Sequence, residues 1–589
     1  MKTAFYFAIA SALTLTACND FLTRDPLDEI ADNPEFWDVE SNIRTAVYDE
    51  YTTYFPGYRN HWNRADWFSQ TNIADWTDDN AQQKATFFTK VAPASTSASS
   101  WDFSDVRVIN VLINRINSAN LNSETKEHWL GVTRFLRAME YAKLVSRFGN
   151  VPYYEEALGN TDYTMLYRPR ENRVTVMNKV LDDLNYAIQH IRTSDGEKGL
   201  NITRDVALAY ASRLMLFEGT WQKYRENNTA NAKHFLQAAK DFATTLMSEN
   251  HYSLCANYKD LTTSEDLAGN PEVILYRSYV EGVVMHSLMT FQNTEVEIDS
   301  PSKSLVESYL TKNGLPIHQV GNTQYQGDHT FAAEMTDRDP RLAATIRTSG
   351  LSLTGIDDVW AISGYFGNRF VNPNLIDKPG GSSYTCITDA PVMKLNEVLM
   401  NYIEAAAELA DMGAYTLTQA DFDKTINVIR DRPSTQMPHL ILAGSNLQVN
   451  GVTINDPERD ADVTPIIWEI RRERRTELVY EGIRFNDLRR WSKLHYADMV
   501  RNPKANRGAY LDKTAFVAQY NATHTTPITV ETLKGVKIEG GGTAGYIQPI
   551  TSTALMRTMA EKDYLYPLPE DQITLYKSRG YELPQNPGW

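Results

Sequence analysis

Residues 470 to 491 read Ile-Arg-Arg-Glu-Arg-Arg-Thr-Glu-Leu-Val-Tyr-Glu-Gly-Ile-Arg-Phe-Asn-Asp-Leu-Arg-Arg-Trp, and this signature stretch decides the fold. Its acidic residues stand three or four positions from its arginines, a spacing at which side chains meet on a helix. Seven arginines also suggest nucleic acid, but the whole chain has 58 basic and 74 acidic residues, and its net charge of −16 repels phosphate backbones. We therefore interpret the stretch as an ion-pair network inside a helical scaffold and predict no nucleic-acid partner.

Helical periodicity recurs along the chain. Apolar residues follow helical spacing over 124–148, 174–192, from behind Thr203 to about Tyr224, over about 232–247, and over 392–410, while Thr464-Pro465 reads as a cap followed by proline at the first helical position. Short connections between helices with one apolar face each suggest stacked helical hairpins of the tetratricopeptide kind, although no strict 34-residue period appears. A mainly α fold is expected.

Long irregular segments interrupt this pattern. Residues 251–390, 433–463 and 497–550 are rich in Gly, Pro, Asn, Asp and Ser and carry only short β-leaning runs. Loops of this length are usually functional or disordered. A length of 589 residues first suggests several lobes, but helices and insertions alternate so closely that we expect one interleaved unit.

The N-terminus has the features of an export signal. Lys2 precedes an apolar run from Phe5 to Leu15 that is too short to span a bilayer, so residues 1–17 read as a signal peptide. Leu15-Thr-Ala-Cys18 resembles the lipobox of bacterial lipoproteins, which implies that Cys18 carries the lipid. The alternative is an ordinary secreted protein with a chance cysteine. Cys255 and Cys386 are too few for a disulfide framework and are expected to be buried thiols or one optional bridge.

Several motifs together resemble the SusD/RagB family of outer-membrane nutrient-binding lipoproteins. They are the signature stretch, Tyr566-Pro-Leu-Pro-Glu570, Gln585-Asn-Pro-Gly-Trp589, Cys18-Asn-Asp-Phe-Leu22, Arg137-Ala-Met-Glu-Tyr141, Arg147-Phe-Gly-Asn-Val-Pro152, Asn270-Pro-Glu-Val-Ile274, Arg338-Asp-Pro-Arg-Leu342 and Lys394-Leu-Asn-Glu-Val-Leu399. Lys394 is a departure, since the family usually has Arg there, and it puts a bidentate ion pair in doubt.

The resemblance implies a tetratricopeptide-like helical-hairpin scaffold with long irregular insertions containing short strands. It places a single unit over 18–589, with a scaffold at about 34–250 and 392–495, ligand-binding insertions at about 55–101 and 251–390, and a C-terminal signature at 564–589. It also implies a lipid anchor in the outer membrane, a chain that faces the cell exterior, and a SusC-like TonB-dependent transporter as partner.

Catalytic and metal-binding patterns are weak or absent. There is no H-E-x-x-H, G-x-S-x-G, P-loop or EF-hand pattern, and Gly540 to Gly545 reads as a loop. The eleven histidines show no metal-ligand spacing, so neither a metal nor a cofactor is predicted. Acidic pairs such as Asp78/Asp79 and Asp357/Asp358 leave a glycan hydrolase open as an alternative.

Aromatic residues with polar tips give the strongest functional pattern. Trp and Tyr (11 and 32) outnumber Phe (21) two to one, and four tryptophans fall between 62 and 101 among polar residues. Sugar rings stack on flat aromatic faces and hydrogen-bond to neighbouring Asn, Asp and Arg. The candidate ligand contacts are Trp62, Trp67, Trp76, Trp101, Arg64, Asn72, Asp75, Tyr279, Phe291, Trp360 and Tyr365. The alternative for each tryptophan is packing under a long loop.

The leading hypothesis is a non-enzymatic surface lipoprotein that captures an oligosaccharide and passes it to a TonB-dependent transporter. Peptide capture, which part of the family performs, is the second hypothesis. A cell-surface glycan hydrolase is the third.

Overall fold

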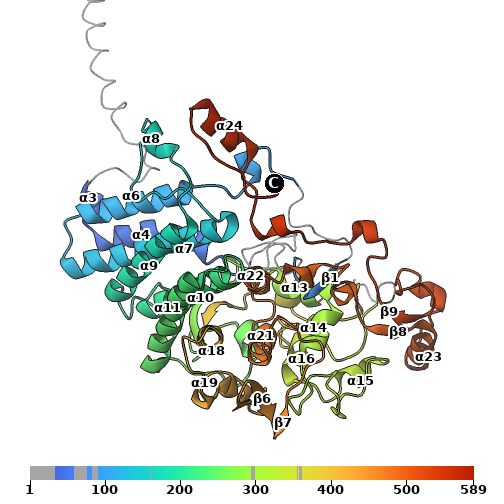
Figure 1. Cartoon of the computed structure of the whole chain (residues 1–589). Helices are drawn as coiled ribbons and strands as arrows, with labels where there is room; N and C mark the ends of the chain where they lie inside the picture. The colour runs from blue at the N-terminus through green and yellow to red at the C-terminus, as the bar shows by residue number, and fades with distance from the viewer. Residues whose placement is uncertain are drawn as a thin grey trace, which may run out of the picture.

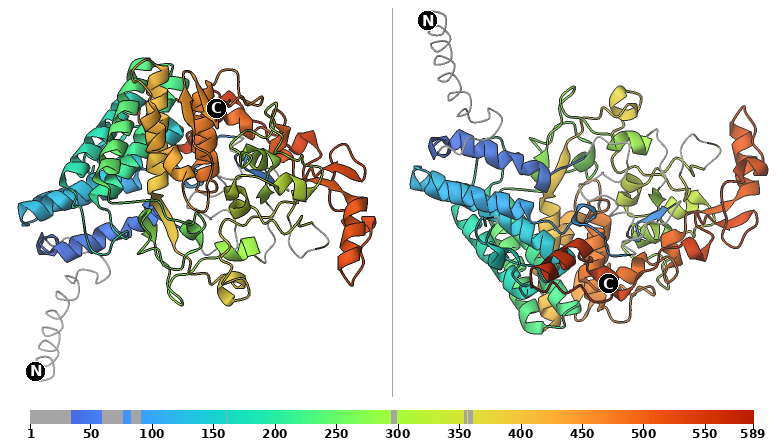
Figure 2. Two further views of the ribbon diagram at one scale, coloured as in Figure 1. Left: turned by 90° about the horizontal axis from the view of Figure 1, so that it is seen from below. Right: turned by 90° about the horizontal axis from the view of Figure 1, so that it is seen from above.

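The computed structural model describes residues 34–58, 76–82, 91–159, 161–293, 299–353, 356 and 361–589. Long helices gather on one side of the molecule, and short helices, strands and irregular segments gather on the other (Figure 1 and Figure 2). The longer helices of the scaffold are α4 (Glu40–Asp49), α6 (Ser104–Ser118), α7 (Ser123–Phe148), α9 (Arg173–His190), α10 (Arg204–Tyr224), α11 (Thr229–Glu249), α18 (Leu395–Asp411) and α21 (Pro465–Glu477).

The predicted helices are confirmed, with boundaries set by their caps. The side chain of Asn122 accepts a hydrogen bond of 3.0 Å from the backbone N–H of Thr125 at the start of α7, and Thr203 caps α10 as expected. The helix expected over 392–410 begins only at Leu395, because residues 392–394 belong to strand β4 (Ala390–Lys394).

The helices pack in series as hairpins. α6 packs on α7, α7 on α9, α9 on α10, α10 on α11, α11 on α18, and α18 on α21. The faces that meet carry the apolar residues of the sequence pattern, such as Phe135, Leu184, Leu208 and Leu236, all of which lie in the largest buried cluster. Burial of these faces stabilises the scaffold, since most of the stability of helices in proteins comes from packing of an apolar face.

Gly219 allows α10 and α11 to approach closely. A Cβ atom there would lie 2.6 Å from Leu236 Cγ and 2.8 Å from the Leu236 backbone nitrogen. Because backbone cannot move aside as a flexible side chain can, we expect Gly219→Ala to lower the stability of the chain by about 1–3 kcal/mol despite the better helix propensity of alanine. Thermal unfolding measures this loss; an equal or higher unfolding temperature would contradict the close approach.

The described residues include four small antiparallel sheets, three of which join segments that are distant in the chain. β1 (Asn80–Gln82) pairs with β3 (Asp299–Pro301), and β2 (Val273–Arg277) pairs with β4. The others are the meander of β5 (Ile441–Ala443), β6 (Asn446–Val449) and β7 (Val452–Thr453), and the pair of β8 (Tyr510–Asp512) and β9 (Ala544–Tyr546). The prediction of short strands within long insertions is confirmed.

Short helices fill the insertions and both ends of the described chain. They are α3 (Pro34–Trp37), α5 (Tyr51–Tyr54), α8 (Tyr163–Leu166), α12 (Asp260–Thr263), α13 (Leu288–Asn293), α14 (Lys303–Ser308), α15 (Phe331–Met335), α16 (Pro340–Thr345), α17 (Pro379–Ser382), α19 (Gln419–Asp423), α20 (Ile426–Arg430), α22 (Arg484–Arg490), α23 (Lys513–Thr523) and α24 (Glu570–Ser578).

Charged residues of the signature stretch form buried ion pairs, as predicted. Glu473 lies 2.7 Å from Arg341 and 2.8 Å from Arg430, and Glu477 lies 2.9 Å from Arg341 and 2.8 Å from Arg432. All five side chains are buried. Most partners come from outside the stretch, so the network ties α21 to the insertion that contains α16 and to the segment after α20.

Lys394, which departs from the family pattern, still forms an ion pair. Its ammonium group lies 2.5 Å from Glu481 Oε2, and the same carboxylate also accepts from Arg369 at 3.2 Å. Lysine therefore supplies the charge at this position, and Arg369 supplies the planar group.

Both cysteines that the structure describes, Cys255 and Cys386, are buried and unpaired. Cys18 lies outside the described residues. No helix in the described parts of the chain is both long enough and apolar enough to cross a membrane.

Candidate ligand-binding groove

The β1–β3 pair brings the two predicted ligand-binding insertions together. Asn80 lies opposite Pro301 and Ala81 opposite Ser300, although more than 200 residues separate them in the chain. The chain leaving this pair continues into α14, which packs on α21. The two insertions therefore meet beside the signature stretch.

A groove lies at this junction. It consists of two connected cavities of about 320 and 240 Å³, which share Glu307, His318, Glu458 and Lys504 in their walls. Volumes in this range suit small-molecule ligands. Asp78 and residues of α14 form one wall, and Arg472 and Arg475 of α21 form part of another.

Rings from several separate segments border the groove. They include those of His318, Tyr325, Trp468, Tyr496 and Tyr546. The tyrosines and Trp468 are half-buried, and His318 is exposed. Carboxylates fix the polar tips of three of them: Trp468 Nε1 donates to Asp456 Oδ2 at 2.8 Å, the Tyr546 hydroxyl donates to Asp328 at 2.8 Å, and the Tyr496 hydroxyl donates to Asp460. The rings are thus held in place before any ligand arrives.

Tyr325 differs from the other tyrosines of the groove. Its hydroxyl is buried and has no hydrogen-bond partner among the residues that the structure describes. Its ring packs edge-on against His318 with centroids 6.2 Å apart. A buried hydroxyl without a partner is costly, so Tyr325 offers a hydrogen bond that a ligand would complete.

The carboxylates of the groove are held ionised. Burial opposes ionisation of Glu307, but its hydrogen bond with His318 and the nearby Lys504 and Lys303 ammonium groups hold its pKa at about 2. Burial also opposes ionisation of Asp456, and Arg472 nevertheless keeps its pKa below the usual range. These groups accept hydrogen bonds and do not supply protons at neutral pH.

An inner cavity of about 270 Å³ lies on the other side of α22. Its walls include Phe55 and Gly57 from one segment, and Phe217 and Phe485 from the scaffold. Trp76 also packs on Phe485, with ring centroids 5.4 Å apart. The residues before the undescribed segment 59–75 therefore line this cavity, and Trp76 after it packs on one of the cavity walls.

Many of the predicted ligand contacts fall outside the described residues. These are Trp62, Trp67, Arg64, Asn72, Asp75 and Trp360, together with the side chain of Phe291, whose backbone belongs to α13. Trp76 is half-buried. The acidic pair Asp357/Asp358 also lies outside.

Three predicted contacts are buried in the protein and offer no ring face to solvent. Trp101 is 3% exposed and packs edge-on against Phe148, with ring centroids 5.0 Å apart. The Tyr279 hydroxyl donates to the carbonyl of Tyr58, and the Tyr365 hydroxyl donates to Glu334 at 2.8 Å. Both tyrosine hydroxyls have a protein partner, which lets these rings sit in a core. The expectation of exposed platforms at these three positions is corrected.

Asp78 and Asp79 are both held by arginines of the signature stretch. Asp78 accepts from Arg484 at 2.9 Å, and Asp79 accepts from Arg475 at 2.8 Å. Although burial opposes ionisation, Arg475 and Arg484 lower the pKa of Asp78, whereas burial and the neighbouring Asp78 carboxylate raise the pKa of Asp79. Both carboxylates act as structural partners of the signature arginines.

Five residues of the groove were missed as ligand candidates: His318, Tyr325, Trp468, Tyr496 and Tyr546. His318, Tyr325 and Tyr546 lie in insertions that composition had marked as functional. Trp468 and Tyr496 lie in or near the signature stretch, where a structural role was expected. The composition of the insertions was therefore the only available signal.

Comparison with known proteins agrees with this architecture. Residues 290–589 match the model of the SusD family, and residues 51–261 match a family described as starch-binding and associating with the outer membrane. A SusD-like protein of Formosa agariphila is 25% identical over 262 residues; the match spans 42% of this chain and about half, 46%, of that protein.

Solved structures share the fold over nearly the whole chain. A SusD-like carbohydrate-binding protein of Bacteroides fragilis superposes with a TM-score of 0.64 and 22% identity, covering 92% of this chain and 99% of that one. A second SusD-like protein of Bacteroides fragilis gives 0.63 and 20%, covering 96% and 100%. Because the SusD model matches just over half of the 589 residues, the chain belongs to the SusD family.

Proposed function

We propose that the chain is a lipid-anchored surface protein that binds an oligosaccharide in the groove and delivers it to a SusC-like TonB-dependent outer-membrane transporter. The observation that carries the proposal is the groove itself, a polar space bordered by fixed rings where the two insertions meet. Rings stack on the apolar faces of sugars, and carboxylates, Asn502 and Lys504 hydrogen-bond to hydroxyl groups.

The fold relatives support a glycan over a peptide. The first of the solved structures is described as a carbohydrate-binding protein. An extended peptide binds best by adding to a free strand edge, whereas the groove is bordered by side chains of helices and loops.

The tryptophan-rich segment remains part of the proposal. Trp62, Trp67, Arg64, Asn72 and Asp75 are proposed to add ligand contacts, because residues that flank the segment lie beside the inner cavity and the groove. Trp360 is proposed as a further contact from the second insertion. Asp78, two residues after Trp76, lines the groove.

The charges of the groove support binding without catalysis. A glycoside hydrolase needs one carboxylic acid whose raised pKa keeps it protonated. The pKa values of Glu307, Asp456 and Asp460 are all lowered by neighbouring cations or hydrogen-bond donors, despite burial.

The lipid on Cys18 is proposed to hold the chain at the outer membrane. Capture and transport would then occur at one surface, with the transporter receiving the bound ligand. Replacing Cys18 with Ser should release the exported chain into the medium, which cell fractionation would detect.

Tyr325→Phe tests the groove. We expect glycan affinity to fall about tenfold, because the variant keeps the ring and removes only the unpaired hydroxyl. Calorimetry against plant, host and microbial oligosaccharides, with peptides alongside, first identifies the ligand class and then compares the variants. Tyr163→Phe, at an exposed tyrosine far from the groove in sequence, is the matched control.

The same measurements separate the alternatives. Unchanged affinity in Tyr325→Phe and in His318→Ala would reject the groove as the site. If only peptides bind, the peptide-capture hypothesis replaces the glycan hypothesis. If a bound glycan is hydrolysed, the hydrolase hypothesis holds.

A further inference from the structure

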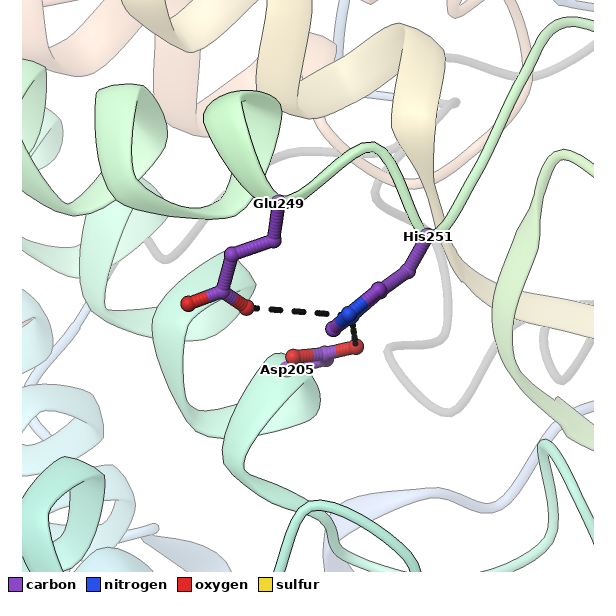
Figure 3. Close-up of side chains that lie close together, drawn as sticks. All are labelled: Asp205, Glu249 and His251. Carbon is purple, nitrogen blue, oxygen red and sulfur yellow. Dashed lines mark hydrogen bonds and ion pairs between the residues drawn. The ribbon is translucent and has the colours of Figure 1, made fainter.

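Three metal-ligand side chains converge at one end of the α10–α11 hairpin. Figure 3 shows Asp205, Glu249 and His251 pointing toward one another. His251 Nδ1 lies 2.9 Å from Asp205 Oδ2 and 3.7 Å from Glu249 Oε2. One ligand atom of each residue lies within 4.8 Å of the others.

Two oxygen atoms of this cluster accept no hydrogen bond of ordinary geometry from the described residues, although the Tyr252 hydroxyl lies close to Asp205. Asp205 is 4% exposed, yet its Oδ1 atom accepts no hydrogen bond of ordinary geometry from the described residues, and neither does the buried Oε2 atom of Glu249. Buried carboxylate oxygens are normally satisfied. The orphan atoms belong to the two residues that face the imidazole.

The neighbouring groups favour a cation. Arg204 pairs with Glu249 through Oε1, which leaves Oε2 directed at His251. One guanidinium does not balance two carboxylates. Glu249 is also the last residue of α11, where the carbonyl ends of the helix attract positive charge.

We propose that Asp205, Glu249 and His251 bind a divalent transition-metal ion such as Zn²⁺. Ligand atoms around a tetrahedral zinc ion lie about 3.4 Å apart, given bonds of roughly 2.1 Å. The separations of 2.9 and 3.7 Å lie on either side of that value. The ion would replace the proton between His251 and Asp205, and water would complete its coordination.

The donor set selects the class of metal. One imidazole and two carboxylates suit zinc and similar ions, whereas calcium prefers six to eight oxygen ligands. His251 is 48% exposed in its side chain, so an ion can enter from solvent. Once bound, it would join the first turn of α10 to the end of α11.

The positions of the three residues in the sequence explain why no metal-binding motif predicted the site. Glu249 and His251 are two positions apart, and Asp205 lies more than 40 residues earlier in the chain. Only the hairpin brings them together.

Zinc titration of the purified, tag-free protein tests the proposal. Calorimetry at pH 7 is expected to show one zinc ion bound per chain, and His251→Ala and Glu249→Gln are each expected to raise Kd about tenfold or more. Zinc at 100 times the wild-type Kd should raise the unfolding temperature of the wild type by about 2 °C and that of the two variants by clearly less. His439→Ala is the matched control. His439 lies 2.6 Å from Asp431 on the surface, and the two form no three-ligand group with another described residue.

Three results would overturn the site. One is the absence of stoichiometric binding at about 100 µM zinc. Another is an equal loss of affinity in His251→Ala and His439→Ala, which would mean adventitious surface binding. The third is tighter binding of calcium than of zinc that His251→Ala does not change.

Discussion

Glu477→Ala should lower the free energy of unfolding by about 3–5 kcal/mol, because it removes one partner from a buried ion-pair network. Glu477 is 0% exposed and lies 2.9 Å from Arg341 and 2.8 Å from Arg432. Asn396 also donates to it at 2.9 Å. Alanine leaves two guanidinium groups and an amide short of acceptors in a site that water does not reach. Urea unfolding followed by circular dichroism measures the loss.

An exposed pair provides the matched control. Glu124 lies 2.7 Å from Arg192, but its side chain is 64% exposed. Solvent screens such a pair, so Glu124→Ala should cost less than about 1 kcal/mol. Equal losses in the two variants would show that the buried network contributes no more than a surface contact.

The effect of Glu477 should depend on pH. Burial opposes its ionisation, but Arg432 and Arg341 hold its pKa below the usual value of 4.5. A carboxylate with a lowered pKa in the folded state contributes stability above the pKa of the unfolded chain and loses it as pH falls. The difference between wild type and Glu477→Ala should therefore be constant near neutral pH and shrink below about pH 4.5. A difference that grows in acid would contradict the assignment.

The sequence predicted the network without predicting its partners. Spacing along one helix accounts for pairs such as Arg472 with Glu469 and Arg490 with Asp487. Arg341 and Arg432 reach Glu477 from separate segments, and no periodicity relates those positions. Helical spacing predicts which charged residues share a helix face. Which of them form ion pairs depends on how the insertions pack against the scaffold.

The same limit applies to the rings of the candidate site. Helices of the scaffold could be predicted because their apolar faces repeat at 3.6 residues. The insertions have no such period, so composition marked the regions but could not tell Trp101, which is buried, from Trp468, which borders the groove. A tryptophan among polar residues in sequence can still pack in a core when its neighbours in space are apolar.

Trp101→Ala should then act on stability and leave glycan binding intact. The Trp101 ring packs against Phe148 at 5.0 Å and Phe103 at 5.2 Å between centroids, inside the largest core cluster. Removing a fully packed indole leaves a cavity, and the expected loss of stability is about 3–5 kcal/mol. Trp101→Phe, which retains most of the buried ring, should cost much less. In calorimetry below the unfolding transition, the folded fraction of Trp101→Ala should bind the identified oligosaccharide with wild-type affinity. If the variant instead keeps its stability and no longer binds the oligosaccharide, Trp101 belongs to the binding site, and its assignment to the core is contradicted.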